Sequence, residues 1–137
     1  MPPPKIIAIA AMNENRVIGA QGKIPWHIPE DMKRFAQLTT GYTVLMGRKT
    51  YESLPDAYRP LPDRHNIVVT RRADSLKGQE GIRVVDSARA FIMRCMTNVE
   101  RLETTKLWII GGGEIYGETM PLWEEVYLTL VKGKQAG

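Results

Sequence analysis

The feature that most constrains the fold of this chain is a regular alternation between short apolar runs and segments of helical period. The runs are rich in residues that favour strands, and they occupy residues 5–12, 42–47, 66–70, 82–85, 106–112 and 125–131. Segments of helical period lie between several of them, at residues 30–39, 48–54, 87–96 and 114–120. Nearly continuous apolar strands that alternate with helices are typical of a parallel sheet covered on both faces. The sequence therefore predicts an α/β fold with an open, mostly parallel central sheet flanked by helices.

Length and composition indicate a single domain spanning residues 1–137, since 43% of the residues are hydrophobic and 25% are charged. The net charge of +4 is scattered without a basic block, so we expect no nucleic-acid partner. No apolar run approaches the about 20 residues of a membrane span, and the start "MPPPK" lacks the apolar segment of a signal peptide. We therefore expect a soluble, cytoplasmic protein that does not bind membranes.

The single cysteine, Cys95, cannot form a disulfide within the chain. Its helical spacing from Phe91 and Ile92 predicts a buried core thiol. A nucleophilic role is the weaker alternative, because no histidine lies near it in the sequence.

Ligands of open α/β sheets bind beyond the carboxyl ends of the strands, so the residues that follow each strand deserve inspection. Residues 13–26 follow the first strand, are polar, contain two glycines and end at Trp26. Their length suits a mobile flap over a bound ligand. A plain surface loop is the alternative interpretation of the same stretch.

Basic residues follow the second and third strands. Arg48 and Lys49 begin a helix, where cations oppose the helix dipole and call for a compensating anion such as a phosphate. The alternative is that both side chains are simply solvated. Thr70, Arg71 and Arg72 follow the third strand and should lie at the same edge of the sheet. Two basic clusters at neighbouring strand ends favour a shared phosphate ligand.

Three glycines at 111–113 separate the fifth strand from a helix, a pattern that lets a backbone come close to a pyrophosphate. The full GxGxxG spacing is absent, so the turn alone is weak evidence. Together with the arginines it indicates a phosphorylated dinucleotide.

Asp31 raises the question of why a carboxylate lies beside an apolar stripe. With Pro29 in the first helical turn, Asp31 would be stabilised by the helix dipole without any function. However, its spacing also puts it on the face of Met32, Phe35 and Thr39. A carboxylate turned toward apolar surface needs hydrogen-bond donors, and a ligand with two parallel N–H groups would supply them.

Six stretches carry a family resemblance: "IAIAAMNENRVIG", "IPWHIPEDMKRF", "VLMGRKTYESL", "RPLPDRHNIVVTR", "WIIGGGEIY" and "VYLTL". In this order they resemble bacterial dihydrofolate reductase over nearly the whole chain. The resemblance implies that NADPH reduces 7,8-dihydrofolate to 5,6,7,8-tetrahydrofolate, by hydride transfer to C6 and protonation at N5. It also implies antifolate inhibitors as ligands, and no metal site.

The resemblance implies roles for particular residues. Asp31 would bind the pterin N3 and 2-amino group and promote protonation, within a catalytic group of Asp31, Trp26 and Thr129. Arg64 would hold the carboxylate of the glutamate tail, with Leu61 against the aminobenzoyl ring. The remaining substrate-binding residues would be Ile9, Ala10, Met32, Phe35, Leu54, Ile110 and Tyr116. The NADPH-binding residues would be Ala11, Ile18, Gly47, Arg48, Lys49, Thr50, Thr70, Arg71, Gly111, Gly112, Gly113, Glu114 and Ile115.

The chain departs from the family pattern in two places. Family members usually continue beyond "VKGKQAG" into a final antiparallel hairpin, so we expect the hairpin to be lacking, in a naturally short or a truncated sequence. Without it, residues 125–131 would lie at a sheet edge, which leaves a monomer and an edge-strand homodimer open. Glu114 stands where some relatives carry a basic residue. His27 and His65 do not match catalytic positions, and we interpret both as structural or surface residues.

Two alternative functions remain open. The reductase of riboflavin biosynthesis shares the fold and an NADPH site, but that family does not need the acid of "PWHIPEDM". A low-activity or non-catalytic module that binds a pteridine or a nucleotide is the other alternative, suggested by the expected loss of the C-terminal hairpin.

Overall fold

The computed structural model describes residues 3–13, 29–54, 58–72 and 81–131, with the backbone alone at residues 11–13, 29–33 and 128–131. Six strands form one sheet: β1 (Lys5–Asn13), β2 (Thr43–Gly47), β3 (His65–Val69), β4 (Ile82–Val85), β5 (Lys106–Gly111) and β6 (Glu125–Val131). The helices are α1 (Pro29–Thr39), α2 (Arg48–Ser53), α3 (Ala88–Met96) and α4 (Gly113–Thr119), followed by the 3-10 turn η3 (Met120–Leu122). Each predicted strand and helix is confirmed to within one or two residues at its ends.

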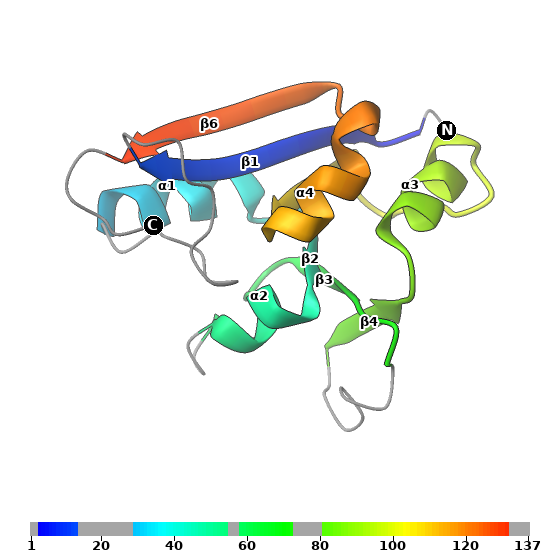
Figure 1. The fold of residues 1–137 in the computed structure, drawn as a ribbon, viewed down its shortest axis with the longest axis horizontal. Coiled ribbons are helices and arrows are strands. Elements are labelled where there is room, and N and C mark those ends of the chain that lie inside the picture. Colours follow the sequence, from blue (N-terminus) through cyan, green and yellow to red (C-terminus); the bar gives the residue numbers. More distant parts are fainter. Residues whose placement is uncertain (1–2, 14–28, 55–57, 73–80, 132–137) are drawn as a thin grey trace.

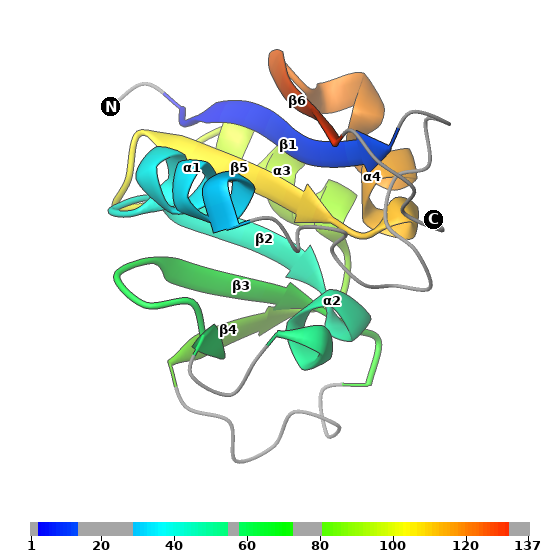
Figure 2. The same cartoon turned by 90° about the vertical axis from the view of Figure 1, so that its left-hand side faces the viewer.

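The sheet has the strand order β4-β3-β2-β5-β1-β6, and every described pairing is parallel. The prediction of a mostly parallel sheet is therefore confirmed. Figure 2 shows the arrowheads of the strands pointing the same way, with α2 and α4 at the end to which they point. The carboxyl ends of β3, β2, β5 and β1 thus lie next to one another along one edge of the sheet.

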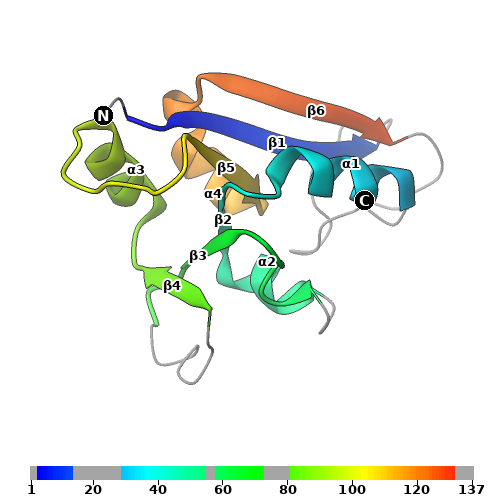
Figure 3. The ribbon, with the colours of Figure 1, turned by 180° about the vertical axis from the view of Figure 1, so that it is seen from behind.

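Alternate residues of the central strands belong to two separate hydrophobic cores, one on each face of the sheet. Ile7 and Ile9 of β1 pack on one face with Phe35 of α1 and residues of α2. Ile6 and Ala8 pack on the opposite face with residues of α3 and α4. Figure 1 shows α4 in front of the sheet, and Figure 3, drawn from behind, shows α1 on the other side. Burial on both faces explains why these strands are continuous in apolar residues.

Helix α3 fixes one of these cores and contains the single cysteine. Ser87 caps the helix, because its hydroxyl accepts a hydrogen bond of 3.1 Å from the Ala90 amide. Cys95 is fully buried, as predicted, and burial raises the pKa of its thiol from the ordinary 9.0 to about 11. The thiol is therefore protonated and packed as a small apolar group.

Strand β6 is tied to β1 where both strands begin. The backbone amide of Ile6 donates to the Glu124 carboxylate at 2.7 Å, and the Glu124 amide donates back to the Ile6 carbonyl at 2.8 Å. Lys5 and Glu125 add an ion pair beside them. Within the described part of the chain, no helix has the length and hydropathy to cross a bilayer.

Candidate active site

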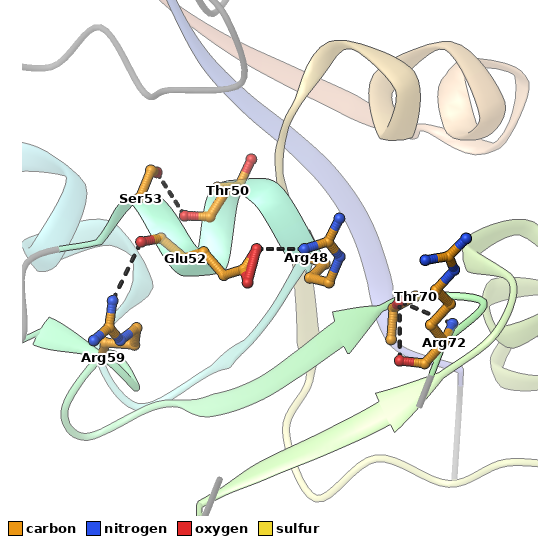
Figure 4. Close-up of polar contacts among 7 residues, drawn as sticks. All are labelled: Arg48, Thr50, Glu52, Ser53, Arg59, Thr70 and Arg72. Carbon is orange, nitrogen blue, oxygen red and sulfur yellow. Dashed lines mark hydrogen bonds and ion pairs between the residues drawn. The ribbon is translucent and has the colours of Figure 1, made fainter. Parts of the chain in front are cut away.

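The predicted phosphate-binding residues lie together at the carboxyl edge of the sheet, because β2 pairs with both β3 and β5. Helix α2 begins immediately after β2, residues 70–72 follow β3, and the glycine turn follows β5. Figure 4 shows Arg48 at the start of α2 and Arg72 beyond the end of β3. Their neighbourhood follows from the parallel topology alone.

Arg48 pairs with an anion that the sequence interpretation did not consider. Its Nη1 lies 2.5 Å from Oε1 of Glu52, one helical turn further along α2 (Figure 4). The two side chains are 35% and 48% exposed. The expectation that Arg48 is compensated by a phosphate or simply solvated is thus incomplete, because a carboxylate of the same helix contacts it. The neighbouring Lys49 is exposed.

Thr70 closes a small turn at the end of β3. Its hydroxyl accepts a hydrogen bond of 3.0 Å from the Arg72 amide (Figure 4), while its own amide donates to the Val85 carbonyl of β4 at 2.9 Å. Arg71, between them, is exposed. Arg71 is thus an exposed cation at the end of β3, the strand that pairs with β2.

Two glycines of the turn after β5, Gly111 and Gly112, are closely packed. Gly111 has φ of +114°, and a Cβ there would lie 3.1 Å from the Tyr116 ring. A Cβ on Gly112 would lie 3.3 Å from Oγ1 of Thr50 in α2. The peptide bond between Gly111 and Gly112 is cis. Glycine at these positions therefore lets the end of β5 pack closely against α2 and α4.

Most predicted wall residues of the substrate pocket gather in the core cluster on the α1 face: Ile9, Phe35, Leu54, Leu61 and Ile110. Ala10 and Tyr116 belong to the cluster on the opposite face. Tyr116 still reaches β1, since its hydroxyl donates to the Ile9 carbonyl at 2.8 Å. Burial raises the pKa of Tyr116 well above its ordinary value, so the phenol remains a neutral donor.

Arg64 is held in a defined place beside α1. Its Nη1 donates to Oγ1 of Thr39 at 3.0 Å, its Nε donates to the Pro62 carbonyl at 2.9 Å, and its guanidinium lies 5.7 Å from the centre of the Phe35 ring. Desolvation lowers the pKa of Arg64, and the nearby Asp63 partly opposes this effect. Among the described residues no carboxylate forms an ion pair with Arg64, so a ligand carboxylate would compensate for the lost hydration of its charge.

Asn66 and Thr39 support this region and were missed by the sequence interpretation as supporting residues. The buried Asn66 amide accepts from the Leu61 amide at 2.9 Å and donates to the carbonyls of Leu61 and Arg64, each at 3.0 Å. Thr39, fully buried, accepts from Arg64 and donates to the Phe35 carbonyl at 2.8 Å. A polar residue at the edge of an apolar run is the only sequence signal for Asn66.

Six predicted site residues are described by backbone alone (Ala11, Asp31, Met32 and Thr129) or lie outside the described residues (Ile18 and Trp26). Asp31 is the third residue of α1 and lies one turn before the buried Phe35. Thr129 of β6 pairs with Ala11 of β1, two residues along the strand from Ile9. The roles of their side chains stay predictions. Ile18, Trp26, His27 and the rest of the predicted flap, apart from Asn13, lie outside the described residues.

Two further predicted positions, Ile115 and Glu114, lie in α4 after the glycine turn, and His65 lies at the start of β3. Ile115 is buried and lies close to the end of β2, since a Cβ on Gly47 would lie 3.2 Å from its side chain. Glu114 is exposed in the first turn of α4. His65 is exposed as predicted, with its Nε2 3.8 Å from the Glu103 carboxylate. The described residues contain no cluster of three metal-binding side chains.

Comparisons with known proteins agree with this architecture. A family model described as dihydrofolate reductase matches residues 5–137. The dihydrofolate reductase of Neisseria meningitidis serogroup A is 44% identical over 127 residues, which cover 93% of this chain and 72% of that protein. The dihydrofolate reductase of Mycobacterium leprae is 44% identical over 114 residues, which cover 83% of this chain and 64% of that protein. The dihydrofolate reductase HdrB of Haloferax volcanii is 38% identical over 113 residues, which cover 82% of this chain and 57% of that protein.

The chain thus spans less than two thirds of the length of the last two relatives. Among solved structures, the dihydrofolate reductase of Enterococcus faecalis complexed with NADP(H) and RAB-propyl superposes with a TM-score of 0.77 at 33% identity. That match covers 97% of this chain and 74% of the other. A family model over almost the whole chain and relatives of such identity lead to one conclusion: the chain belongs to the dihydrofolate reductase family.

Proposed function

We propose that this protein reduces 7,8-dihydrofolate to 5,6,7,8-tetrahydrofolate with NADPH as the reductant. The observation that carries the proposal is that three features lie together in a chain of this family. They are the basic residues that follow β2 and β3, the closely packed glycine turn after β5, and the apolar core residues on the α1 face of the sheet. A flat ring pair needs apolar walls, and a phosphorylated dinucleotide needs cations and an approachable backbone.

The residues at this edge fit such a cofactor. At Gly111 and Gly112 a Cβ would lie 3.1 Å from Tyr116 and 3.3 Å from Thr50, so glycine lets β5, α2 and α4 pack closely at the edge where we place the pyrophosphate. We assign Arg48, Lys49, Thr50, Thr70 and Arg71 to the phosphates. NADPH supplies the hydride, while the protein aligns the two rings and keeps water away from them.

Substrate binding would use both ends of α1. The Asp31 carboxylate would accept two hydrogen bonds from the pterin, at N3 and the 2-amino group, which favours protonation of the ring at N5. At the other end of the helix Arg64 would bind the carboxylate of the glutamate tail, with Leu61 beside the aminobenzoyl ring. Support comes from the position of Arg64, which already has three of its interactions fixed by Thr39, Pro62 and Phe35.

The primary test is a steady-state assay of this chain with NADPH and dihydrofolate, followed by the loss of the absorbance of the reduced nicotinamide. Turnover supports the proposal. Binding of NADPH and an antifolate without turnover would favour the non-catalytic module instead. Turnover of the riboflavin precursor, and not of dihydrofolate, would favour the riboflavin-type reductase.

The Asp31→Asn variant tests the acid itself. We expect normal NADPH binding and loss of most turnover near neutral pH, with partial recovery in acid, where the substrate is already protonated in solution. Turnover of this variant equal to that of the parent at neutral pH would reduce Asp31 to a partner of the helix dipole.

Location and assembly are part of the same proposal. A cytoplasmic location fits a chain whose single cysteine is a free, buried thiol, and fractionation of cells that express the tagged chain would check it. Strand β6 forms one edge of the described sheet and exposes Val126 to 46%, which supports the edge-strand homodimer as the alternative to a monomer. Sedimentation that finds only monomer at high concentration would exclude the homodimer.

A further inference from the structure

The start of α2 presents a cation that is already engaged by an anion of the same helix. The Arg48 guanidinium contacts the Glu52 carboxylate through Nη1 alone, at 2.5 Å. A guanidinium has five N–H donors, so most of the donors of Arg48 remain for a ligand. With 35% of the side chain exposed, Arg48 can be reached from the carboxyl edge of the sheet.

Arg59 contacts the backbone of Glu52. Nη1 of Arg59 donates to the backbone carbonyl of Glu52 at 3.2 Å and lies 3.4 Å from the carbonyl of Leu54 (Figure 4 shows the first contact). These contacts hold the end of α2 in place. The Glu52 side chain extends from this backbone to Arg48, so its charge acts on whatever Arg48 binds.

We propose that Glu52 is a positioning residue that limits how strongly the protein prefers a phosphorylated dinucleotide. The inference rests on the proposed function and adds to it that Arg48 binds the phosphate group that NADPH carries and NADH lacks. Glu52 orients the guanidinium by accepting a hydrogen bond. Its negative charge also partly neutralises Arg48 and repels the incoming phosphate, so affinity for NADPH is held below what Arg48 and Arg71 alone would give.

The Glu52→Gln variant separates these two effects, because the amide oxygen still accepts from Arg48 while the charge is gone. We expect NADPH to bind about threefold tighter, the scale of one exposed charge interaction, and NADH to bind as before. The gain should shrink at high salt, since the pair is partly exposed and therefore screened.

Titration of the full chain with NADPH and with NADH by calorimetry, at low and high salt, measures these affinities. The matched control is Glu103→Gln, which removes the same charge from an 83% exposed side chain before β5, at the opposite edge of the sheet. The Arg48→Gln variant and the double variant complete a cycle, in which Glu52→Gln should have no effect once Arg48 is gone.

The outcomes divide cleanly. Tighter NADPH binding in Glu52→Gln that disappears in the Arg48→Gln background and is absent in Glu103→Gln supports the inference. Unchanged NADPH binding, an equal change for NADH, or the same gain from Glu103→Gln overturns it while leaving the proposed function intact. A parent chain that binds neither nucleotide overturns the proposed function, and the inference with it.

Discussion

The two edges of the sheet differ in how their polar groups are used. At the amino edge, where the strands begin, side chains pair with one another across elements. Lys5 of β1 forms an ion pair with Glu125 of β6, and the hydroxyls of Thr43 and Thr104 share a hydrogen bond of 2.7 Å. These contacts join neighbouring strands and loops, so the amino edge is largely a structural region.

The carboxyl edge keeps cations that the described residues do not neutralise. The Arg48–Glu52 pair lies within one short helix, and Lys49 and Arg71 form no ion pair with any residue that the structure describes. Both edges arise from the same parallel strands, but ion pairs between different elements are described only at the amino edge. The contrast teaches that the surplus of unpaired cations, rather than the topology alone, marks the edge where an anionic ligand is expected.

The largest effect should come from the carboxyl edge, at Gly111. In Gly111→Ala the new methyl group would meet the Tyr116 ring at 3.1 Å in a backbone with φ of +114°, and we expect a loss of about 2–4 kcal/mol in the free energy of unfolding. Urea denaturation measures the loss. Binding of NADPH should weaken as well, because the turn would have to move.

Gly113→Ala is the matched control for that variant. Gly113 is exposed, and a Cβ there meets no atom within 4 Å. Its free energy of unfolding should remain close to that of the parent. Equal losses in both variants would mean that the close packing around Gly111 is not what makes the turn intolerant.

An intermediate effect is expected at Thr39, which tests an exception to the contrast. Arg64 precedes β3 and so belongs to the amino edge, yet among the described residues it has no carboxylate partner. Thr39→Val keeps the shape of the side chain and removes the hydroxyl that accepts from Arg64. KM for dihydrofolate should rise about three- to tenfold, the scale of one hydrogen bond to a charged group, with kcat nearly unchanged.

Thr39→Ser retains the hydroxyl and is the control. It should restore most of the affinity for dihydrofolate. A shortened pterin that lacks the glutamate tail should be bound equally by all three proteins. If the Val variant weakened binding of that shortened pterin as much as binding of dihydrofolate, Thr39 would act on the pocket in general and not through Arg64.

The smallest effect is expected from Lys5 at the amino edge. Lys5→Gln breaks the ion pair with Glu125, but both side chains are exposed, at 46% and 37%, and such pairs contribute little. The urea midpoint should shift only slightly, and the affinity for NADPH should not change. A clear loss of NADPH affinity would contradict the division of labour between the two edges.

Much of the fold follows from the sequence, because burial on both faces leaves apolar strands that differ plainly from amphipathic helices. The bounds of β2, for example, are set by the glycine at 47, and α3 begins after the capping Ser87. Parallel pairing then puts Arg48, Arg71 and the glycine turn at one edge without further information. The order of the strands depends on contacts distant in sequence, which periodicity does not reveal.

The supporting residues of the site were harder to find for the same reason. Glu52 could have been anticipated from its spacing of four residues from Arg48. Asn66 and Thr39 could not, since their partners come from separate segments that meet only after the chain folds. A buried side-chain amide looks like an exposed one in the sequence, and its three hydrogen bonds exist only in the assembled loop.

The buried thiol described in α3 has a practical consequence. Cys95 is the only cysteine, and its thiol is protonated and buried between α3 and the sheet. The folded protein should therefore not react with thiol reagents. Reaction then requires α3 to separate from the sheet, so the labelling rate under native conditions measures how often that opening occurs. Labelling of Cys95 thus measures local opening of the protein without an engineered probe, on the face of the sheet opposite to Arg64 and Asn66.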